Sequence, residues 1–127
     1  MEEQLINAGS VIGKEVLNLE DGTFAGKVQN LLIDEKTKCI IGLQLKQKGS
    51  LNGKNMAPYS VVKAFGSHAV TINTISNLVT VNGKDIVAMP IVTIDGTVLG
   101  RVFDYTFTST GEIAEYILTD GIIKGAL

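Results

Sequence analysis

Residues 21–30 read Asp21-Gly22-Thr23-Phe24-Ala25-Gly26-Lys27-Val28-Gln29-Asn30, and this stretch decides the fold because it recurs 74 residues later. It aligns without gaps on Asp95-Gly96-Thr97-Val98-Leu99-Gly100-Arg101-Val102-Phe103-Asp104. Asp-Gly between apolar runs favours a hairpin, because glycine accepts positive φ and the aspartate side chain can bond backbone N–H groups of the turn. We therefore predict hairpin tips at Asp21-Gly22 and Asp95-Gly96 and a duplicated strand-turn-strand unit.

Each turn is followed four residues later by a second glycine, Gly26 in the first copy and Gly100 in the second. Inside a returning strand, such a glycine usually marks a bulge or a sharp bend, and bent strands help to close barrels. The residues beyond Gly100 then alternate between apolar and polar. This pattern predicts a strand with Phe103, Tyr105 and Phe107 on one face.

The first copy continues through segments whose polarity changes regularly. A polar turn at 34–37 separates two apolar runs, and Cys39 to Leu45 should form the strand after it. The polar, glycine-rich stretch that follows predicts a surface loop over 46–57. Further on, we expect a turn at Pro58-Tyr59-Ser60, a last strand from His68 to Ile72, a connection over 73–84, and a turn at Ser109-Thr110-Gly111 in the second copy.

Composition agrees with an all-β protein. Hydrophobic residues make up 45% of the 127 positions, Val, Ile and Thr are plentiful, and 14 glycines favour tight turns. A single cysteine cannot form an internal disulfide, which favours a reducing compartment. Glu2 and Glu3 stand where a secretory signal would be basic, and the charge-free run 64–83 is too polar for a membrane span. These features predict a cytoplasmic location.

An Asp-Gly hairpin, a glycine four residues on, a strand pair, a loop and a proline-containing turn before a closing strand together resemble the PRC-barrel family. The pattern covers Val11 to Asn73, with a second pass from Asp85 onward. The resemblance implies a small, six-stranded, SH3-like antiparallel β-barrel. It also implies a binding or adaptor role, since relatives include a module of the photosynthetic reaction centre H subunit and the C-terminal module of a ribosome-maturation factor. A shared fold does not by itself establish a shared function.

The two copies differ in length, and we divide the chain into 1–79 and 80–127. The first copy runs roughly 30 residues past its third strand, whereas the second stops at Leu127, as if its closing strands were missing or the fragment had been cut short. An unclosed barrel exposes a strand edge that can pair with another chain. We expect the copies to associate with each other, or a second chain to complete the barrel as in a homodimer.

The sequence contains few candidates for catalytic residues. There is one histidine, His68, and one cysteine, Cys39, and we interpret them as a turn-edge residue and a small core or strand residue, although His68 could make a pH-sensitive contact. Asp21 and Asp95 serve turns. Phosphate-binding glycine motifs are absent from the sequence. We therefore expect no enzyme activity, no cofactor and no metal.

Charge distribution suggests two kinds of partner. Residues 11–79 carry eight lysines and five acids, and residues 80–127 carry three bases and six acids, so the halves have net charges of +3 and −3. This asymmetry is either ordinary solvated surface or complementary docking. Three lysines, Lys46, Lys48 and Lys54, form a candidate interaction loop. We favour a protein-binding adaptor, with RNA or ribosome binding as the alternative that a net charge of −2 and a single arginine make less attractive.

Overall fold

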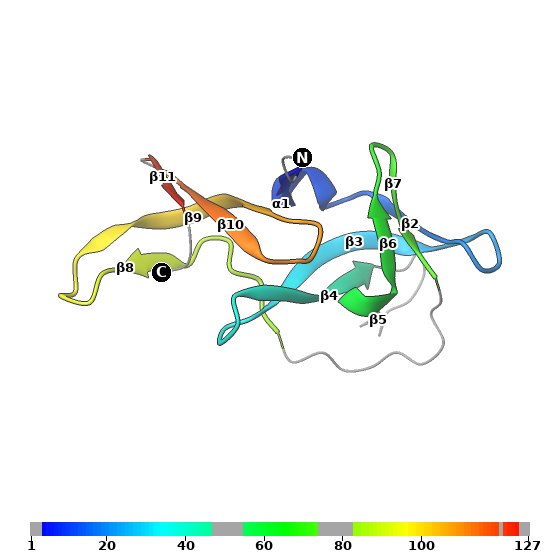
Figure 1. Ribbon diagram of the computed structural model, residues 1–127, viewed down its shortest axis with the longest axis horizontal. Coiled ribbons are helices and arrows are strands. Elements are labelled where there is room, and N and C mark those ends of the chain that lie inside the picture. The colour runs from blue at the N-terminus through cyan, green and yellow to red at the C-terminus, as the bar shows by residue number, and fades with distance from the viewer. Residues whose placement is uncertain (1–3, 47–54, 74–82, 120, 125–127) are drawn as a thin grey trace.

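The computed structural model describes residues 4–46, 55–73, 83–119 and 121–124, and nearly all of its elements are β-strands (Figure 1). The expected all-β fold is confirmed. In chain order, the elements are β1 (Ile6–Asn7), α1 (Ala8–Val11), β2 (Glu15–Asn18), β3 (Thr23–Asp34), β4 (Cys39–Lys46), β5 (Asn55–Pro58), the 3-10 helix η1 (Tyr59–Val61), β6 (Val62–Phe65), β7 (Ala69–Ile72), β8 (Pro90–Val92), β9 (Val98–Phe107), β10 (Ile113–Leu118) and β11 (Gly121–Lys124).

The first sheet has six strands in the order β5-β4-β3-β2-β7-β6 and curls into a small barrel (Figure 1). Strands β2 and β3 form the hairpin at Asp21-Gly22. The chain then returns through β4, β5 and η1, and β7 extends the sheet beyond β2, with which it pairs in parallel. Branched apolar side chains from these strands, including Val16, Leu43 and Val70, are fully buried inside the barrel. Burial of this apolar surface is the main favourable contribution to folding.

The second sheet places β9 and β10 between β1 and β11, with β8 also paired to β9. Its cross-strand register repeats the register of the first sheet. The matching pairs are Val16↔Gly26 with Ile91↔Gly100, Val28↔Leu45 with Val102↔Leu118, Leu31↔Leu43 with Tyr105↔Tyr116, and Ile33↔Ile40 with Phe107↔Ile113. In the ladders that correspond between the halves, the register also shifts three times in each half, at corresponding places. The two halves therefore share a strand arrangement as well as a sequence motif.

Phe103 breaks the alternation expected from the sequence. Its side chain is 69% exposed, whereas Tyr105 and Phe107 are buried. The ladder between β9 and β10 passes from Ile117↔Asp104 to Leu118↔Val102, which leaves Phe103 as the extra residue of a bulge. A bulge shifts the alternation by one position. The expectation that Phe103 shares a face with the other two aromatic residues was therefore wrong.

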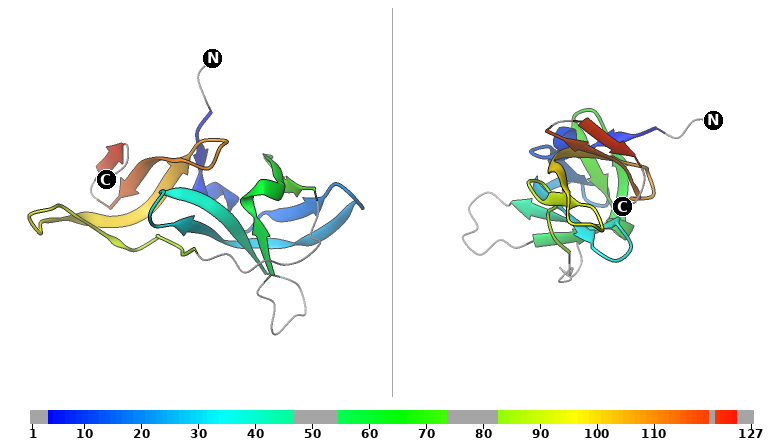
Figure 2. Two further views of the ribbon diagram at one scale, coloured as in Figure 1. Left: turned by 60° about the horizontal axis from the view of Figure 1, so that its bottom comes forward. Right: turned by 90° about the vertical axis from the view of Figure 1, so that its left-hand side faces the viewer.

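The two halves are joined by an exchange of their leading segments. Strand β1, which precedes the first half, pairs with the end of β9 through Ile6↔Phe107. The segment that precedes the second half pairs with the end of β3, where Lys84 and Ile33 exchange two backbone hydrogen bonds of 3.0 and 3.1 Å. In addition, the Gly9 N–H donates to the Asp104 carboxylate at 2.8 Å. Figures 1 and 2 show the two hairpin systems meeting near the middle of an elongated molecule.

The turns of the two halves also bond to each other reciprocally. The Ile40 N–H donates to the Gly111 carbonyl at 2.8 Å, and the Ile113 N–H donates to the Lys38 carbonyl at 3.3 Å. Buried side chains from both halves form one continuous hydrophobic cluster. Residues of both halves therefore contribute to a common core.

Gly111 should be hard to replace because two constraints act on it. Its φ is +92°, and an added Cβ would lie 3.2 Å from the Ile40 carbonyl oxygen and 3.3 Å from the Tyr59 ring. Gly96 has a similar φ of +89° with nothing within 4 Å of the added atom. We expect Gly96→Ala to cost about 1 kcal/mol from backbone strain alone and Gly111→Ala to cost about 1–3 kcal/mol more.

Urea unfolding of both variants measures this difference. Equal losses of stability would show that the contact between the turns tolerates the added methyl group.

Candidate functional site

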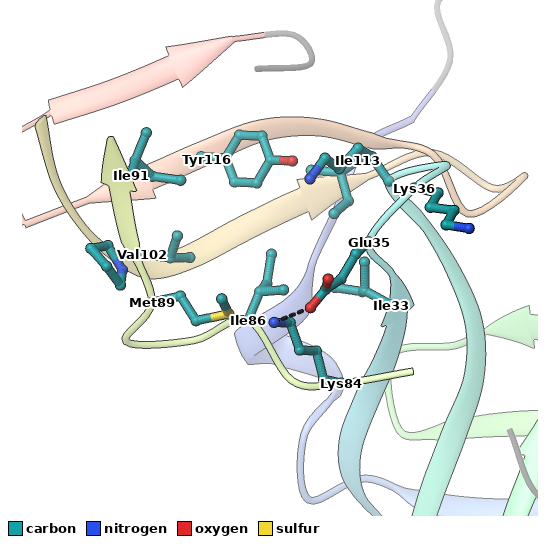
Figure 3. A pocket seen from close by; sticks show the side chains of 12 residues that line it. Ile33, Glu35, Lys36, Lys84, Ile86, Met89, Ile91, Val102, Ile113 and Tyr116 are labelled. Atoms are coloured by element: carbon teal, nitrogen blue, oxygen red, sulfur yellow. Dashed lines mark ion pairs between the residues drawn. The ribbon is translucent and has the colours of Figure 1, made fainter. Parts of the chain in front are cut away.

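An apolar groove of about 420 Å³ lies where the two halves meet (Figure 3). Its floor and one side come from the second half, and its other side comes from the turn between β3 and β4. The lining residues are Ile33, Glu35, Lys36, Lys38, Lys84, Ile86, Met89, Pro90, Ile91, Val102, Ile113 and Tyr116. A hollow of this size and composition is typical of a binding site.

Strand pairing positions the apolar side chains of the groove. Ile91 lies on β8, Val102 on β9 and Tyr116 on β10, so three neighbouring strands contribute to one concave surface. Ile86 and Met89 come from the segment that leads into β8, where the Met89 N–H donates to the Ile86 carbonyl at 3.1 Å. Figure 3 shows these side chains gathered around one hollow.

The rim of the groove carries more positive than negative charge. Lys84 forms an ion pair with Glu35, and this interaction holds the pKa of the Glu35 carboxyl below its usual value. Both side chains are about half exposed, so the pair contributes little to stability. Lys36 and Lys38 line the same side. The rim therefore favours a ligand with a negative charge at that end.

The groove lining includes one phenol, Tyr116, and one carboxylate, Glu35. Burial raises the pKa of the Tyr116 phenol above its ordinary value. The lining residues include one carboxylate, and it is already paired with Lys84. Within the described ranges, no three His, Cys, Asp or Glu residues lie close enough to hold a metal ion.

The structure places the residues singled out in the sequence at the turns and bulges. The Asp21 carboxylate accepts bonds from the Thr23 N–H at 2.9 Å and the Thr23 hydroxyl at 2.6 Å. The Asp95 carboxylate accepts from the Thr97 N–H at 3.3 Å and from the Thr93 hydroxyl. The glycines Gly22, Gly26, Gly96 and Gly100 have φ values of +72°, +136°, +89° and +151°. All six residues lie outside the groove lining.

His68 and Cys39 lie away from the groove. His68 is exposed in the turn before β7, and its Nδ1 is 3.0 Å from the Ser67 hydroxyl. Cys39 begins β4, is partly exposed, and its thiol donates to the Thr37 carbonyl at 3.5 Å. Neither side chain lines the groove.

The expected lysine loop is shorter than the sequence indicated. Lys46 is the last residue of β4, and Asn55–Pro58 forms β5, which pairs with β4. The assignment of 46–57 to one loop was therefore wrong at both ends, because the ladder between these strands extends into it. Lys48 and Lys54 lie outside the described residues.

Sequence reasoning did not find the groove, because its lining comes from separate segments that only the fold brings together. The repeated sequence motif was the available signal for Val102, which aligns on Val28 at the 74-residue offset. The place of Ile91 emerges only from the strand register. Ile91 and Val102 occupy the places that Val16 and Val28 hold in the first half, where both are buried. Treating these positions as a barrel interior would have indicated an apolar cavity in the second half.

Comparison with known families identifies the class of protein. The sequence profile of the PRC-barrel domain matches residues 3–79, which is more than half of the chain. The chain therefore belongs to the PRC-barrel family, a family of small β-barrel modules. No curated protein matches the sequence. Neither short helix in the described part of the chain is long enough to cross a membrane.

The carboxylates of the two turns should make stability depend on pH. Hydrogen bonds from Thr23 lower the pKa of Asp21, and hydrogen bonds from Thr93 and Thr97 lower the pKa of Asp95. A lowered pKa in the folded state stabilises the protein above the unfolded value of 3.8, and this contribution is lost as the pH falls through the lower folded value.

We therefore expect Asp21→Asn and Asp95→Asn to lower the unfolding free energy at neutral pH and to have much less effect at about pH 2. Urea unfolding at the two pH values measures the change. A loss of stability that is the same at both would show that the carboxylate charge is not involved.

Proposed function

We propose that this chain is a non-catalytic PRC-barrel module that binds another protein through its second half, residues 80–127. The observation that carries this proposal is the apolar groove between β8, β9, β10 and the turn of the first half. Concave apolar surfaces flanked by charged side chains are common recognition sites. A second copy of the same chain is one candidate partner, because an open strand edge can also pair with itself.

The proposal includes the interpretation of residues 80–127 as a second PRC-barrel copy. The repeated sequence motif and the repeated strand register support it. In the first half, β7 pairs with the outer edge of β2. The corresponding edge of β8 has no strand beside it among the described residues. The second half would thus be a barrel that another chain can complete.

Exposed apolar side chains concentrate on the same half. Among the described residues, eleven large apolar side chains are exposed, and six of them belong to the β8–β9 hairpin and β11. They are Val92, Ile94, Val98, Leu99, Phe103 and Ile122. Large apolar side chains exposed to solvent on one half of a small protein are consistent with an interaction site there.

RNA or ribosome binding is the second hypothesis, and it rests on the three lysines of the candidate interaction loop. Lys46 is exposed at the end of β4, and the other two lysines lie outside the described residues. Nucleic-acid binding depends on several cations that contact phosphates together. A filter-binding assay with structured RNA at low salt tests this hypothesis directly.

Partner recovery by a tagged full-length chain, from lysate of cells that express it, tests the proposed function. Ile91→Asp should abolish recovery, because it places a charge in the apolar groove. Leu19→Asp should have no effect, since Leu19 is an exposed apolar residue at the tip of the first hairpin. Light scattering on the same samples reports whether the partner is a second copy.

Two results would contradict this function. One is recovery of the same proteins by wild type and Ile91→Asp, with both shown to be folded by circular dichroism. The other is tight binding of structured RNA by the purified chain.

A further inference from the structure

In the first half, the position that corresponds to the groove is covered by side chains of the chain itself. By register, Ile33 corresponds to Phe107, and each lies at the end of a long strand next to the other half. Phe107 is covered by Phe65 of β6, with ring centroids 5.2 Å apart and the rings at 74° to each other. Phe65 in turn packs against Tyr59 of η1 at 6.0 Å. Aromatic side chains of the closing segment, residues 58–73, therefore cover this place.

Strand β7 completes the interior of the first half from the other side. It pairs in parallel with β2, so that Val70 lies beside Val16, and both are fully buried. The ladder continues with a hydrogen bond of 2.8 Å from the Leu19 N–H to the Ile72 carbonyl. By register, Val16 corresponds to Ile91 on β8. Ile91 lines the groove instead of being covered by a strand.

The backbone of β8 is oriented to accept such a strand. The Val102 N–H donates to the Met89 carbonyl at 2.9 Å, and the Thr93 N–H donates to the Thr97 carbonyl at 2.9 Å. Residues 89 and 93 therefore direct backbone groups toward β9. Because these directions alternate along a strand, the N–H and carbonyl of Val92 face away from β9. Pro90 faces the same way without an N–H, which leaves Val92 as the donor at this edge.

The groove differs in charge from the corresponding position in the first half. In the first half, the Tyr59 hydroxyl donates to the Ser109 carbonyl at 2.8 Å. Glu35 corresponds to Ser109, and it is paired with Lys84, while Lys36 and Lys38 lie on the same rim. A segment placed like 58–73 would therefore meet a positive rim at the position of Tyr59, and an acidic residue there would be favoured.

We propose that the groove binds an extended segment of a different protein, which adds to β8 as a parallel strand. The segment places a branched apolar side chain beside Ile91, an aromatic ring against Ile33, and an acidic residue near Lys36 and Lys38. This inference rests on the proposed function and specifies which side chains the partner segment carries.

We assign the added strand to a different protein because the segment of that kind within the described residues is already in use. The closing segment 58–73 is already used in the first half, where Val70 and Ile72 are fully buried. A second copy would have to unfold its own barrel to supply this segment, and the loss of that buried apolar surface would oppose the exchange.

The probe for this proposal is a fluorescent peptide with the sequence of residues 58–73 and the change Tyr59→Glu, titrated into the full chain and followed by anisotropy. We expect saturable binding that Val92→Pro weakens by roughly tenfold or more, because proline removes the outward N–H. Val92→Thr keeps the N–H and the branched shape, so its affinity should match wild type. The peptide that retains Tyr59 should bind several-fold more weakly at low salt, with the difference disappearing at high salt.

A second measurement needs no variant of the protein. Amide hydrogen exchange of the wild-type chain should slow at Val92 when the peptide is saturating, because strand addition protects that N–H. The proposal is overturned if the peptide does not bind, if Val92→Pro binds it like wild type while remaining folded, or if Val92 gains no protection. It is also overturned if the chain alone is a dimer that Val92→Pro converts to a monomer, since a second copy then occupies the edge.

The experiments distinguish a failure of the proposed protein-binding function from a failure of strand addition. Loss of partner recovery in Ile91→Asp without peptide binding would retain the protein-binding function and reject strand addition. Recovery unaffected by Ile91→Asp would reject the function of the groove itself.

Discussion

The structure depends on an exchange between its two halves. The segment before each hairpin system pairs with the long central strand of the other half, β1 with β9 and Lys84 with Ile33 of β3. The two turns then bond to each other through Gly111 and Lys38 carbonyls. These backbone bonds lie beside a continuous apolar cluster, so hydrogen bonding and burial act at the same junction. The position of the groove follows from this junction, because one of its sides belongs to each half.

Net charge does not explain how the halves associate. The first half is net positive and the second is net negative, yet the ion pair between them joins an acid of the first, Glu35, to a base of the second, Lys84. Both side chains are well exposed, and exposed ion pairs contribute little to stability. Backbone pairing and apolar burial hold the junction together. Lys36 and Lys38 lie on the rim of the groove beside this ion pair.

The same strand arrangement has different consequences in the two halves. In the first, η1, β6 and β7 cover the interior, and Phe65 and Val70 pack against it. In the second, the corresponding interior lines a groove of about 420 Å³ beside an edge of β8. A barrel interior is apolar because it is normally covered, so leaving one side open creates apolar surface suited to a partner.

The sequence by itself determined the local features of this protein. Turn chemistry is encoded within a few residues, so Asp21-Gly22 and Asp95-Gly96 predicted the two hairpins. The repeat at a 74-residue offset predicted that the two hairpins have similar structures. The resemblance to PRC barrels rested on the same short motifs. Bulges were harder to place, and Phe103 was assigned to the wrong face because one inserted residue reverses the alternation beyond it.

Only the tertiary structure decided which segments meet. Ile33 and Ile91 are far apart in the sequence, and their approach depends on the exchange of leading segments between the halves. No local propensity encodes that exchange, because the backbone of β3 and β9 can accept any strand that arrives at its edge. The partners were selected by the burial of a shared core, which is a property of the whole chain.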